Sequence, residues 1–230
     1  MGVKQTVTTW AGTAAARRGA PVLASRGAQQ FITKAIDGFP GFPGAREVAR
    51  KYLEKRRDVD RAVRDVIEQH IRLAGVQGFV TNIGGIVAMP VAIPANLAGL
   101  AVLHLRMVAT IAHLRGYDIA DPRVRAAALM TLLGKDGVAS GLRGNDLPGT
   151  PREVAAGAGE LDRLATDRIA ARVTQDLIVR IGGKYATLSV AKRVPVLGGA
   201  VSAGVDAVST YSVGRYADAQ FPPHVMIERA

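Results

Sequence analysis

The sequence predicts an all-α protein that folds as a single compact helical bundle, and three observations favour this class. Apolar side chains recur at spacings of three and four residues along most of the chain, and the alternation typical of strands is absent. The 230 residues are 48% hydrophobic and only 5% aromatic, so small aliphatic side chains are expected to build the core. An uncharged stretch over residues 73–105 is typical of helices that are buried on every side.

Residues 1–39 are expected to form a basic, alanine-rich extension outside this bundle. Residues 1–34 contain five basic residues and no acid, and they lack the apolar run of a secretory signal peptide. Such a segment either frays at the terminus or lies as a helix on an anionic surface. A turn-rich stretch over 37–44 separates it from a helical domain at 40–222, which is followed by a tail at 223–230.

The first long helix is predicted over residues 46–74, because the apolar side chains in this segment keep a helical period. Val48, Tyr52, Val59 and Val63 are part of this pattern, and arginines and acids fill the gaps between them. The helix is therefore expected to bury one face and to expose a charged one.

The uncharged run over 73–105 is the most unusual feature of the sequence. It exceeds the roughly 20 residues that span a bilayer, but two glycines and two prolines interrupt it. We therefore predict a central apolar hairpin of two helices, about 75–88 and 94–115, which are joined at 89–94. Such a hairpin is either the dry core of the bundle or a re-entrant or interfacial element in contact with lipid.

Four further helices are expected after the hairpin. Asp121 and Pro122 are typical of a helix start, and that helix is predicted to reach about residue 134, before a polar loop at 135–152. The remaining helices are predicted at about 151–181, 184–192 and 199–221. Small residues at a spacing of four in the last of them would let two helix backbones approach closely.

The composition excludes several classes of site. The absence of cysteine excludes disulfides, thiolate metal sites and cysteine nucleophiles. The four histidines show no metal-binding spacing, and neither a lysine-containing phosphate loop nor a nucleophile elbow is present, so the sequence identifies no metal site and no cofactor.

The net charge of +11 favours anionic partners. An anionic membrane surface or an apolar, lipid-like ligand is preferred over nucleic acid, because no nucleic-acid recognition motif is present. We expect a cytoplasmic protein that is peripheral at the inner face of the cell membrane, and the sequence is compatible with a homo-oligomer. The candidates for lipid contact are Lys4, Arg17, Arg18, Phe79, Ile86 and Met89.

A few polar residues stand in otherwise apolar segments and are candidates for a ligand site or a buried polar network: Asn96, Arg106, His113 and Asp206. In an enzyme, His113 would act as acid or base, with Asp118 orienting it and Asp206 as its partner. In the structural alternative, Arg106 pairs with Asp118 or Asp206, and His113 bonds a backbone carbonyl.

Three segments together resemble the EcsC family over about residues 40–221. They are Gly78 to Asn96, which includes Met89-Pro-Val-Ala-Ile-Pro, Arg106 to Gly134, which includes Asp121-Pro-Arg-Val-Arg, and Ala191 to Ala217, which includes Val194-Pro-Val-Leu-Gly-Gly. The family is named after the third gene of a bacterial ABC exporter operon. The resemblance implies a compact, hydrophobic helical protein with membrane association and implies no particular reaction. The sequence departs from the family at Asn82, where glycine is common, and at Asn96, where an acid is common, which weakens any role of that position as a base or metal ligand.

These observations leave three functional hypotheses, of which the first is preferred. It is a non-enzymatic protein that associates with membranes or lipids through its basic surface and its apolar hairpin. The second is an enzyme that acts on an isoprenoid or acyl substrate in a cavity between helices. The third is a soluble interaction or scaffold protein that presents an apolar surface patch.

Overall fold

The structure is a computed structural model. It describes the backbone at 32–83, 89–157, 161–191 and 195–224, and the side chains there except at 77–83, 89–98, 177–178, 180–191 and 195–203. Within these residues every regular element is a helix, and strand-like pairing is limited to one isolated bridge between Phe39 and Phe42. The all-α class is therefore confirmed for the part of the chain that is described.

Eight helices follow a short helix at 32–37 along the described chain. They are α2 (Ala45–Arg56), α3 (Val59–Ile83), α4 (Met89–Leu114), α5 (Pro122–Thr131), α6 (Gly134–Arg143), α7 (Pro151–Ala155), α8 (Arg163–Ala191) and α9 (Pro195–Gln220).

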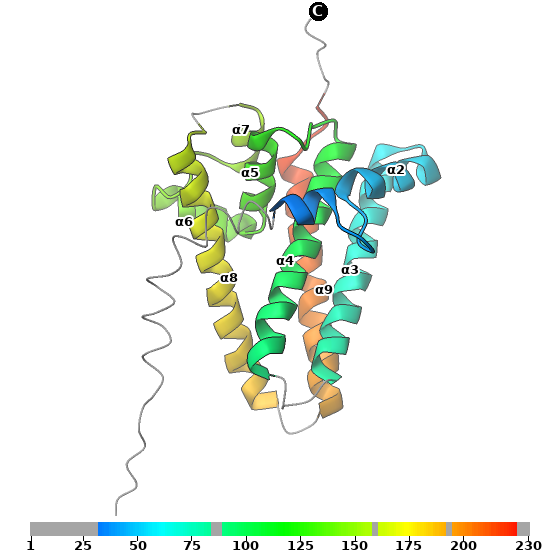
Figure 1. Ribbon diagram of the computed structural model, residues 1–230, viewed down its shortest axis with the longest axis vertical. Helices are drawn as coiled ribbons and strands as arrows, with labels where there is room; N and C mark the ends of the chain where they lie inside the picture. The colour runs from blue at the N-terminus through cyan, green and yellow to red at the C-terminus, as the bar shows by residue number, and fades with distance from the viewer. Residues whose placement is uncertain (1–31, 84–88, 158–160, 192–194, 225–230) are drawn as a thin grey trace, which may run out of the picture.

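The four long helices α3, α4, α8 and α9 run side by side along the longest axis of the molecule (Figure 1). Helices α3 and α8 run away from the end that α2 and α5–α7 cover, and α4 and α9 return to it. We name the covered end the capped end. The opposite end, where α3 and α8 finish and α4 and α9 begin, is named the distal end.

The first long amphipathic segment is broken into two helices, so the prediction of one helix over 46–74 is wrong. Arg57 takes a left-handed backbone conformation with φ of 53°, which ends α2. The Asp58 carboxylate then accepts a hydrogen bond from the Arg61 backbone N–H at 2.7 Å and starts α3. An ion pair at 2.6 Å between Arg56 and Asp65 spans the break.

The apolar hairpin is present as α3 and α4, but its break is not where the prolines predicted it. Helix α3 continues to Ile83 and α4 already begins at Met89, so residues 89–94, where the connection was predicted, are helical. Pro90 is the second residue of α4, where the missing N–H would have no helical partner in any case. Pro94 follows within the helix.

The second half of the chain confirms one predicted helix start and corrects three predicted boundaries. Asp121 caps α5, since its carboxylate accepts a hydrogen bond from the Arg123 N–H at 2.8 Å. The predicted loop at 135–152 contains α6, which buries Val138. The predicted helix at 151–181 is split at Gly157, which has a φ of 86°, and α8 then continues through the predicted helix at 184–192.

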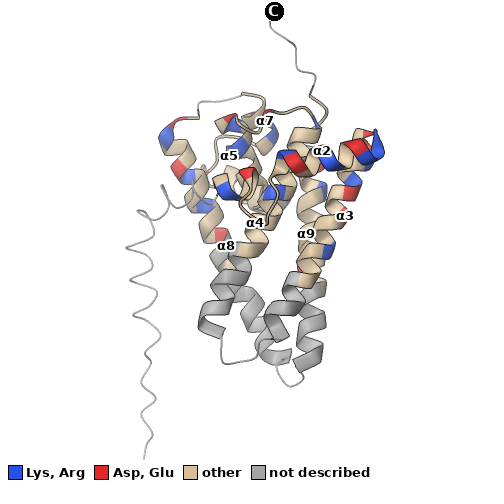
Figure 2. Ribbon diagram, turned by 45° about the vertical axis from the view of Figure 1, so that its right-hand side comes forward, with Lys and Arg blue, Asp and Glu red and all other residues tan. Residues whose placement is uncertain are grey.

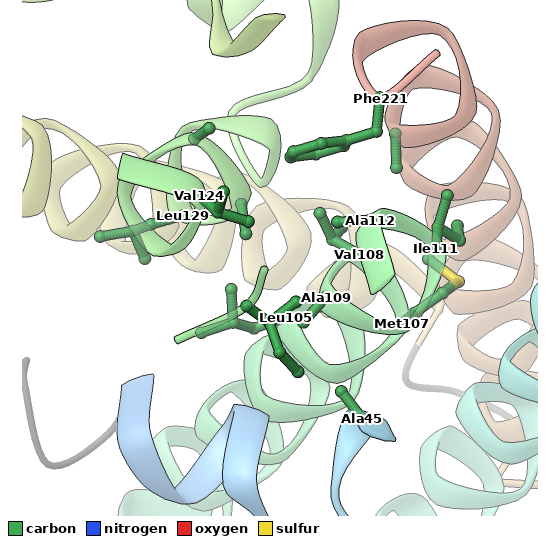
Figure 3. Close-up of a cluster of buried hydrophobic side chains, with 14 of the residues drawn as sticks. Ala45, Leu105, Met107, Val108, Ala109, Ile111, Ala112, Val124, Leu129 and Phe221 are labelled. Carbon is green, nitrogen blue, oxygen red and sulfur yellow. The ribbon is translucent and has the colours of Figure 1, made fainter. Parts of the chain in front are cut away.

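The described hydrophobic core lies at the capped end and is centred on α4. Side chains of α4 from Leu105 to Ala112 meet Val124 and Leu129 of α5 and Phe221 after α9 (Figure 3). The core also includes Ala35 and Ile36 of the short helix at 32–37, so these residues belong to the packed body rather than to a loose extension. Burial of such aliphatic side chains is the main favourable term in folding.

Helices α3 and α9 form the most extensive helix pair, and a glycine allows their close approach. A Cβ at Gly214 would lie only 2.9 Å from Ile67 Cγ1. Gly204, one of the small residues that were expected to promote such packing, has no described neighbour within 4 Å of its Cβ position. Within the helical stretches whose side chains are described, none is long and apolar enough to cross a membrane.

Candidate functional site

A buried arginine joins α4 to α3 and to the turn that precedes α2. The side chain of Arg106 is enclosed, and the residue is only 3% exposed. Its Nε donates a hydrogen bond to His70 Nε2 at 3.3 Å, and its Nη1 donates one to the Pro43 carbonyl at 3.3 Å. The guanidinium carbon lies 3.8 Å from the centre of the Phe42 ring, which is the geometry of a cation–π interaction. These partners stabilise the cation without neutralising its charge.

The arrangement requires His70 to be neutral. The Nδ1–H donates to the Val66 carbonyl at 2.7 Å, which leaves the Nε2 lone pair to accept the hydrogen bond from Arg106. Burial, and next the positive charge of Arg106, lower the pKa of His70 to about 3. His70 therefore acts as a neutral acceptor that orients Arg106 over the whole physiological pH range.

A second buried polar group connects α4 to α9. The Thr210 hydroxyl donates a hydrogen bond to the Asp206 backbone carbonyl at 2.7 Å, so its oxygen accepts the one from His104 Nε2 at 2.9 Å. His104, Asp206 and Thr210 are all buried. Buried polar groups of this kind hold helices in one register when their hydrogen bonds are satisfied.

His113 is half-buried at the end of α4, near the surface of the capped end. Burial, and next the charge of Arg46, lower the pKa of His113, whereas a hydrogen bond to the Tyr117 backbone and the charge of Asp118 raise it. The Asp118 carboxylate itself accepts hydrogen bonds from the Ala120 N–H at 2.9 Å and from Arg46 Nη2 at 3.2 Å. Asp118 therefore shapes the turn after α4 and pairs with α2.

A surface groove of about 560 Å³ separates α2 from the end of α4. Its lining comes from α2 residues Arg46, Glu47, Ala49, Arg50 and Leu53 and from α4 residues His113 and Leu114. Arginines and one histidine therefore face the groove together with aliphatic side chains.

The candidate residues from the sequence do not form one site. His104 and Thr210 share a level of the bundle, His113 lies nine residues further along α4, and Asp206 lies four residues earlier on α9. Because α4 and α9 both run toward the capped end with a rise of about 1.5 Å per residue, His113 and Asp206 lie on the order of 20 Å apart along the axis. The proposed acid–base pair of His113 and Asp206 is therefore not supported.

The partners of Arg106 also differ from those expected. The sequence analysis expected Asp118 or Asp206, whereas the guanidinium contacts His70, Pro43 and Phe42. These three partners lie 36 to 64 positions earlier in the chain, and no local pattern relates them to Arg106.

Several candidates fall outside what the structure describes. Lys4, Arg17, Arg18 and Ile86 lie outside the described residues. Phe79 in α3 and Met89 and Asn96 in α4 belong to helices whose side chains are not described at these positions. Their roles in lipid contact or in a polar network stay predictions. Among the described residues, no group of three or more His, Asp or Glu side chains could hold a metal ion.

The distal end of the long helices differs in composition from the rest of the chain. The described ends of α3, α4, α8 and α9 meet there, and they belong to two sequence stretches: 73–105, which has no charged residue, and 177–205, which has four basic residues and no acid. The basic residues are Arg180, Lys184, Lys192 and Arg193. The helix ends in Figure 1 bring both stretches to the same end of the molecule.

The capped part of the chain carries many charges of both signs, as Figure 2 shows for the described residues. Outside the two stretches, residues 32–224 contain 21 basic and 18 acidic residues. Ion pairs connect neighbouring elements there. Arg115, for example, pairs with both Asp60 of α3 and Asp218 of α9, each at 2.6 Å. Charges at this end are therefore largely matched within the protein.

Comparison with known proteins places the fold in a family. A model of the EcsC protein family matches residues 46–222, which include the named helices from α2 to α9 almost completely. No curated protein and no solved structure matches the chain.

Proposed function

Because the chain belongs to the EcsC protein family, and because that membership defines no role, we propose a function from the charge distribution: non-enzymatic, peripheral binding of an anionic lipid surface. The surface of contact is the distal end of the four long helices. The observation that carries the proposal is the absence of any acid from 73–105 and 177–205, the two stretches that meet there.

The charge of the distal end supports an anionic partner. The stretch 177–205, whose described helix ends lie there, contains four basic residues and no acid, whereas residues 32–224 outside the two stretches hold nearly equal numbers of the two signs. A basic side chain near an anionic membrane surface contributes about 1 kcal/mol of attraction, so four of them contribute roughly 4 kcal/mol at low ionic strength.

The apolar character of the same stretches supports contact with the acyl boundary. Residues 73–83 form the end of α3 and residues 89–105 the first part of α4, and the whole stretch 73–105 contains no charged residue. Apolar surface combined with basic residues favours binding at the boundary between the headgroups and the acyl chains of an anionic membrane. The hairpin would thus enter the headgroup region while the capped end stays in water.

The basic segment 1–31 adds to this attraction. It carries Lys4, Arg17, Arg18 and Arg26 and no acid. Together with 177–205 it accounts for +8 of the net charge of +11. Two weak basic elements bind a surface more firmly than one when both can reach it. We place the protein at the inner, cytoplasmic face of the cell membrane, where anionic lipids are abundant.

Flotation with vesicles tests the proposal. The full chain is mixed with vesicles of phosphatidylcholine alone or of phosphatidylcholine with phosphatidylglycerol, at low and high salt, and is then centrifuged through a density gradient. We expect flotation with the anionic vesicles that weakens as salt screens the charges. A chain that stays at the bottom of the gradient under every condition contradicts the proposal.

A further inference from the structure

The groove between α2 and α4 combines an apolar floor with a basic rim. Leu53 is a large apolar side chain that remains 41% exposed and provides most of the aliphatic surface, whereas Ala49 and Leu114 line the groove but are largely buried. Arg46 and Arg50 stand one helical turn apart on α2, so both guanidinium groups reach the same edge. The volume of about 560 Å³ lies within the range of roughly 300 to 1,000 Å³ that small-molecule sites show.

Within the described residues, the two arginines form ion pairs with exposed carboxylates. Arg46 pairs with Asp118 at 3.2 Å and Arg50 pairs with Glu54 at 3.3 Å, and all four side chains are more than half exposed. Exposed ion pairs contribute little to stability, so an incoming anion can replace either carboxylate with little loss.

The two arginines are the donors that the groove offers to an anion. His113 lies across the groove from α2, but its hydrogen bond to the Tyr117 backbone already uses the single N–H of the neutral ring. Glu47 is the one acid among the lining residues, against the two arginines. The charge of the lining therefore favours a negative ligand over a positive one.

We propose that this groove binds a single-chain amphiphile with an anionic head group, which takes the place of the Asp118 and Glu54 carboxylates on Arg46 and Arg50. The aliphatic chain of the ligand covers Ala49, Leu53 and Leu114. The groove lies at the capped end, on the order of 35 Å from the start of α4, since α4 rises about 1.5 Å per residue over its length. The ligand therefore comes from the aqueous phase rather than from a bilayer at the distal end.

Calorimetric titration of the full chain with octyl sulfate, below its micelle concentration and without vesicles, tests this site. Octyl trimethylammonium has the same chain with the opposite charge, and inorganic sulfate has the charge without the chain. We expect saturable binding of octyl sulfate at one site and at least tenfold weaker binding of both comparison compounds. Equal binding of inorganic sulfate, equal binding of the cation, or no saturable binding of octyl sulfate overturns the proposal.

Two substitutions locate the binding, and a third serves as their control. Arg46→Gln and Arg50→Gln should each weaken octyl sulfate binding about fivefold, as expected for a partly exposed charged contact. Lys51→Gln removes the same charge from an exposed position of α2 that does not line the groove, and it should change the affinity less than twofold. All three positions are exposed, so the variants are expected to fold, which thermal unfolding verifies. Equal weakening in all three variants would mean that net charge, and not the groove, attracts the ligand.

Discussion

The capped and the distal parts of the molecule use charge in opposite ways. Outside 73–105 and 177–205, the sequence from 32 to 224 holds 21 basic and 18 acidic residues. Ion pairs such as Arg125–Asp37 and Arg172–Asp146 connect segments of this part that are far apart in sequence. The stretches 73–105 and 177–205 contain no acid, and the second of them contains four basic residues. Most of the net charge of +11 thus comes from 1–31 and 177–205, two segments that contain basic residues and no acid.

The buried polar residues lie between these two parts. His104 and Arg106 stand at the end of the uncharged run, and both contact neighbouring helices rather than solvent. On α3 and α4, the described residues between this level and the distal end include no acid, whereas ion pairs connect the elements of the capped part. The comparison therefore predicts that changes in the capped part alter stability and that changes in the distal part alter membrane binding.

The largest expected effect is that of Arg106→Ala on stability. The substitution removes the cation–π contact with Phe42 and two hydrogen bonds and leaves a cavity, so the free energy of unfolding should fall by about 3 kcal/mol. Urea unfolding measures this change. Arg106→Met keeps most of the volume and should lose clearly less. If both variants are as stable as the parent, the cluster does not hold α3 and α4 together.

Neutralising the distal charges should affect binding and leave stability nearly unchanged. The triple variant Lys184→Gln, Lys192→Gln, Arg193→Gln should weaken binding to anionic vesicles about 100-fold at low salt, since each charge contributes about 1 kcal/mol. A matched triple at the capped end, Arg123→Gln, Lys135→Gln, Arg143→Gln, should change vesicle binding little. Equal loss in both triples would contradict the difference between the two ends.

Two glycines of α9 distinguish close packing from open surface. Gly214→Ala places a methyl group 2.9 Å from Ile67 Cγ1 and should destabilise the protein by about 2 kcal/mol, because α3 must shift. Gly204→Ala on the same helix meets no described atom within 4 Å and should stabilise the protein by roughly 0.5 kcal/mol through better helix propensity. Thermal unfolding of both variants measures whether each one is less or more stable than the parent. If both changes have the same sign, the close packing of α3 and α9 at Gly214 is refuted.

Acid should weaken the capped part through His70. Its pKa of about 3 in the folded state is below the unfolded value near 6.5, so below pH 6.5 the unfolded chain binds a proton that the folded chain does not. Stability should therefore fall with decreasing pH by up to about 1.4 kcal/mol per pH unit from this residue. His70→Gln keeps an acceptor for Arg106, and its free energy of unfolding should depend less on pH between pH 7 and 5. A smaller dependence should remain in this variant, because the pKa of His113 is also lowered in the folded state. An unchanged slope in that variant would argue against a buried, neutral His70.

The sequence predicted the class of the fold better than its boundaries. Helical spacing was sufficient for an all-α protein, and Asp121 followed by Pro122 indicated the start of α5 correctly. The break at Arg57 was missed because Val48 and Val59 keep the same apolar period on both sides of it. The connection of the hairpin was misplaced because a proline in the first turn of a helix looks locally like one that ends it.

The candidate sites were less predictable, because they depend on contacts between distant segments. Arg106 was singled out from the sequence, but its partners Phe42 and Pro43 lie in a turn more than 60 residues earlier. The groove at His113 was missed since it needs α2 beside the end of α4. The acid-free stretch 177–205 is visible in the sequence, but its relation to 73–105 emerges only when the helix directions are known.

The orientation of the chain on a membrane tests the central claim most directly. Because the chain has no cysteine, single substitutions Ala92→Cys in α4, Ser189→Cys in α8 and Ala219→Cys in α9 give unique sites for an environment-sensitive fluorophore. With anionic vesicles, the labels at 92 and 189 of the distal end should shift to shorter emission wavelengths and become protected from an aqueous quencher. The label at 219, at the capped end, should remain unchanged. Protection at 219 with exposed labels at 92 and 189 would show that the capped end binds the membrane and would contradict the account.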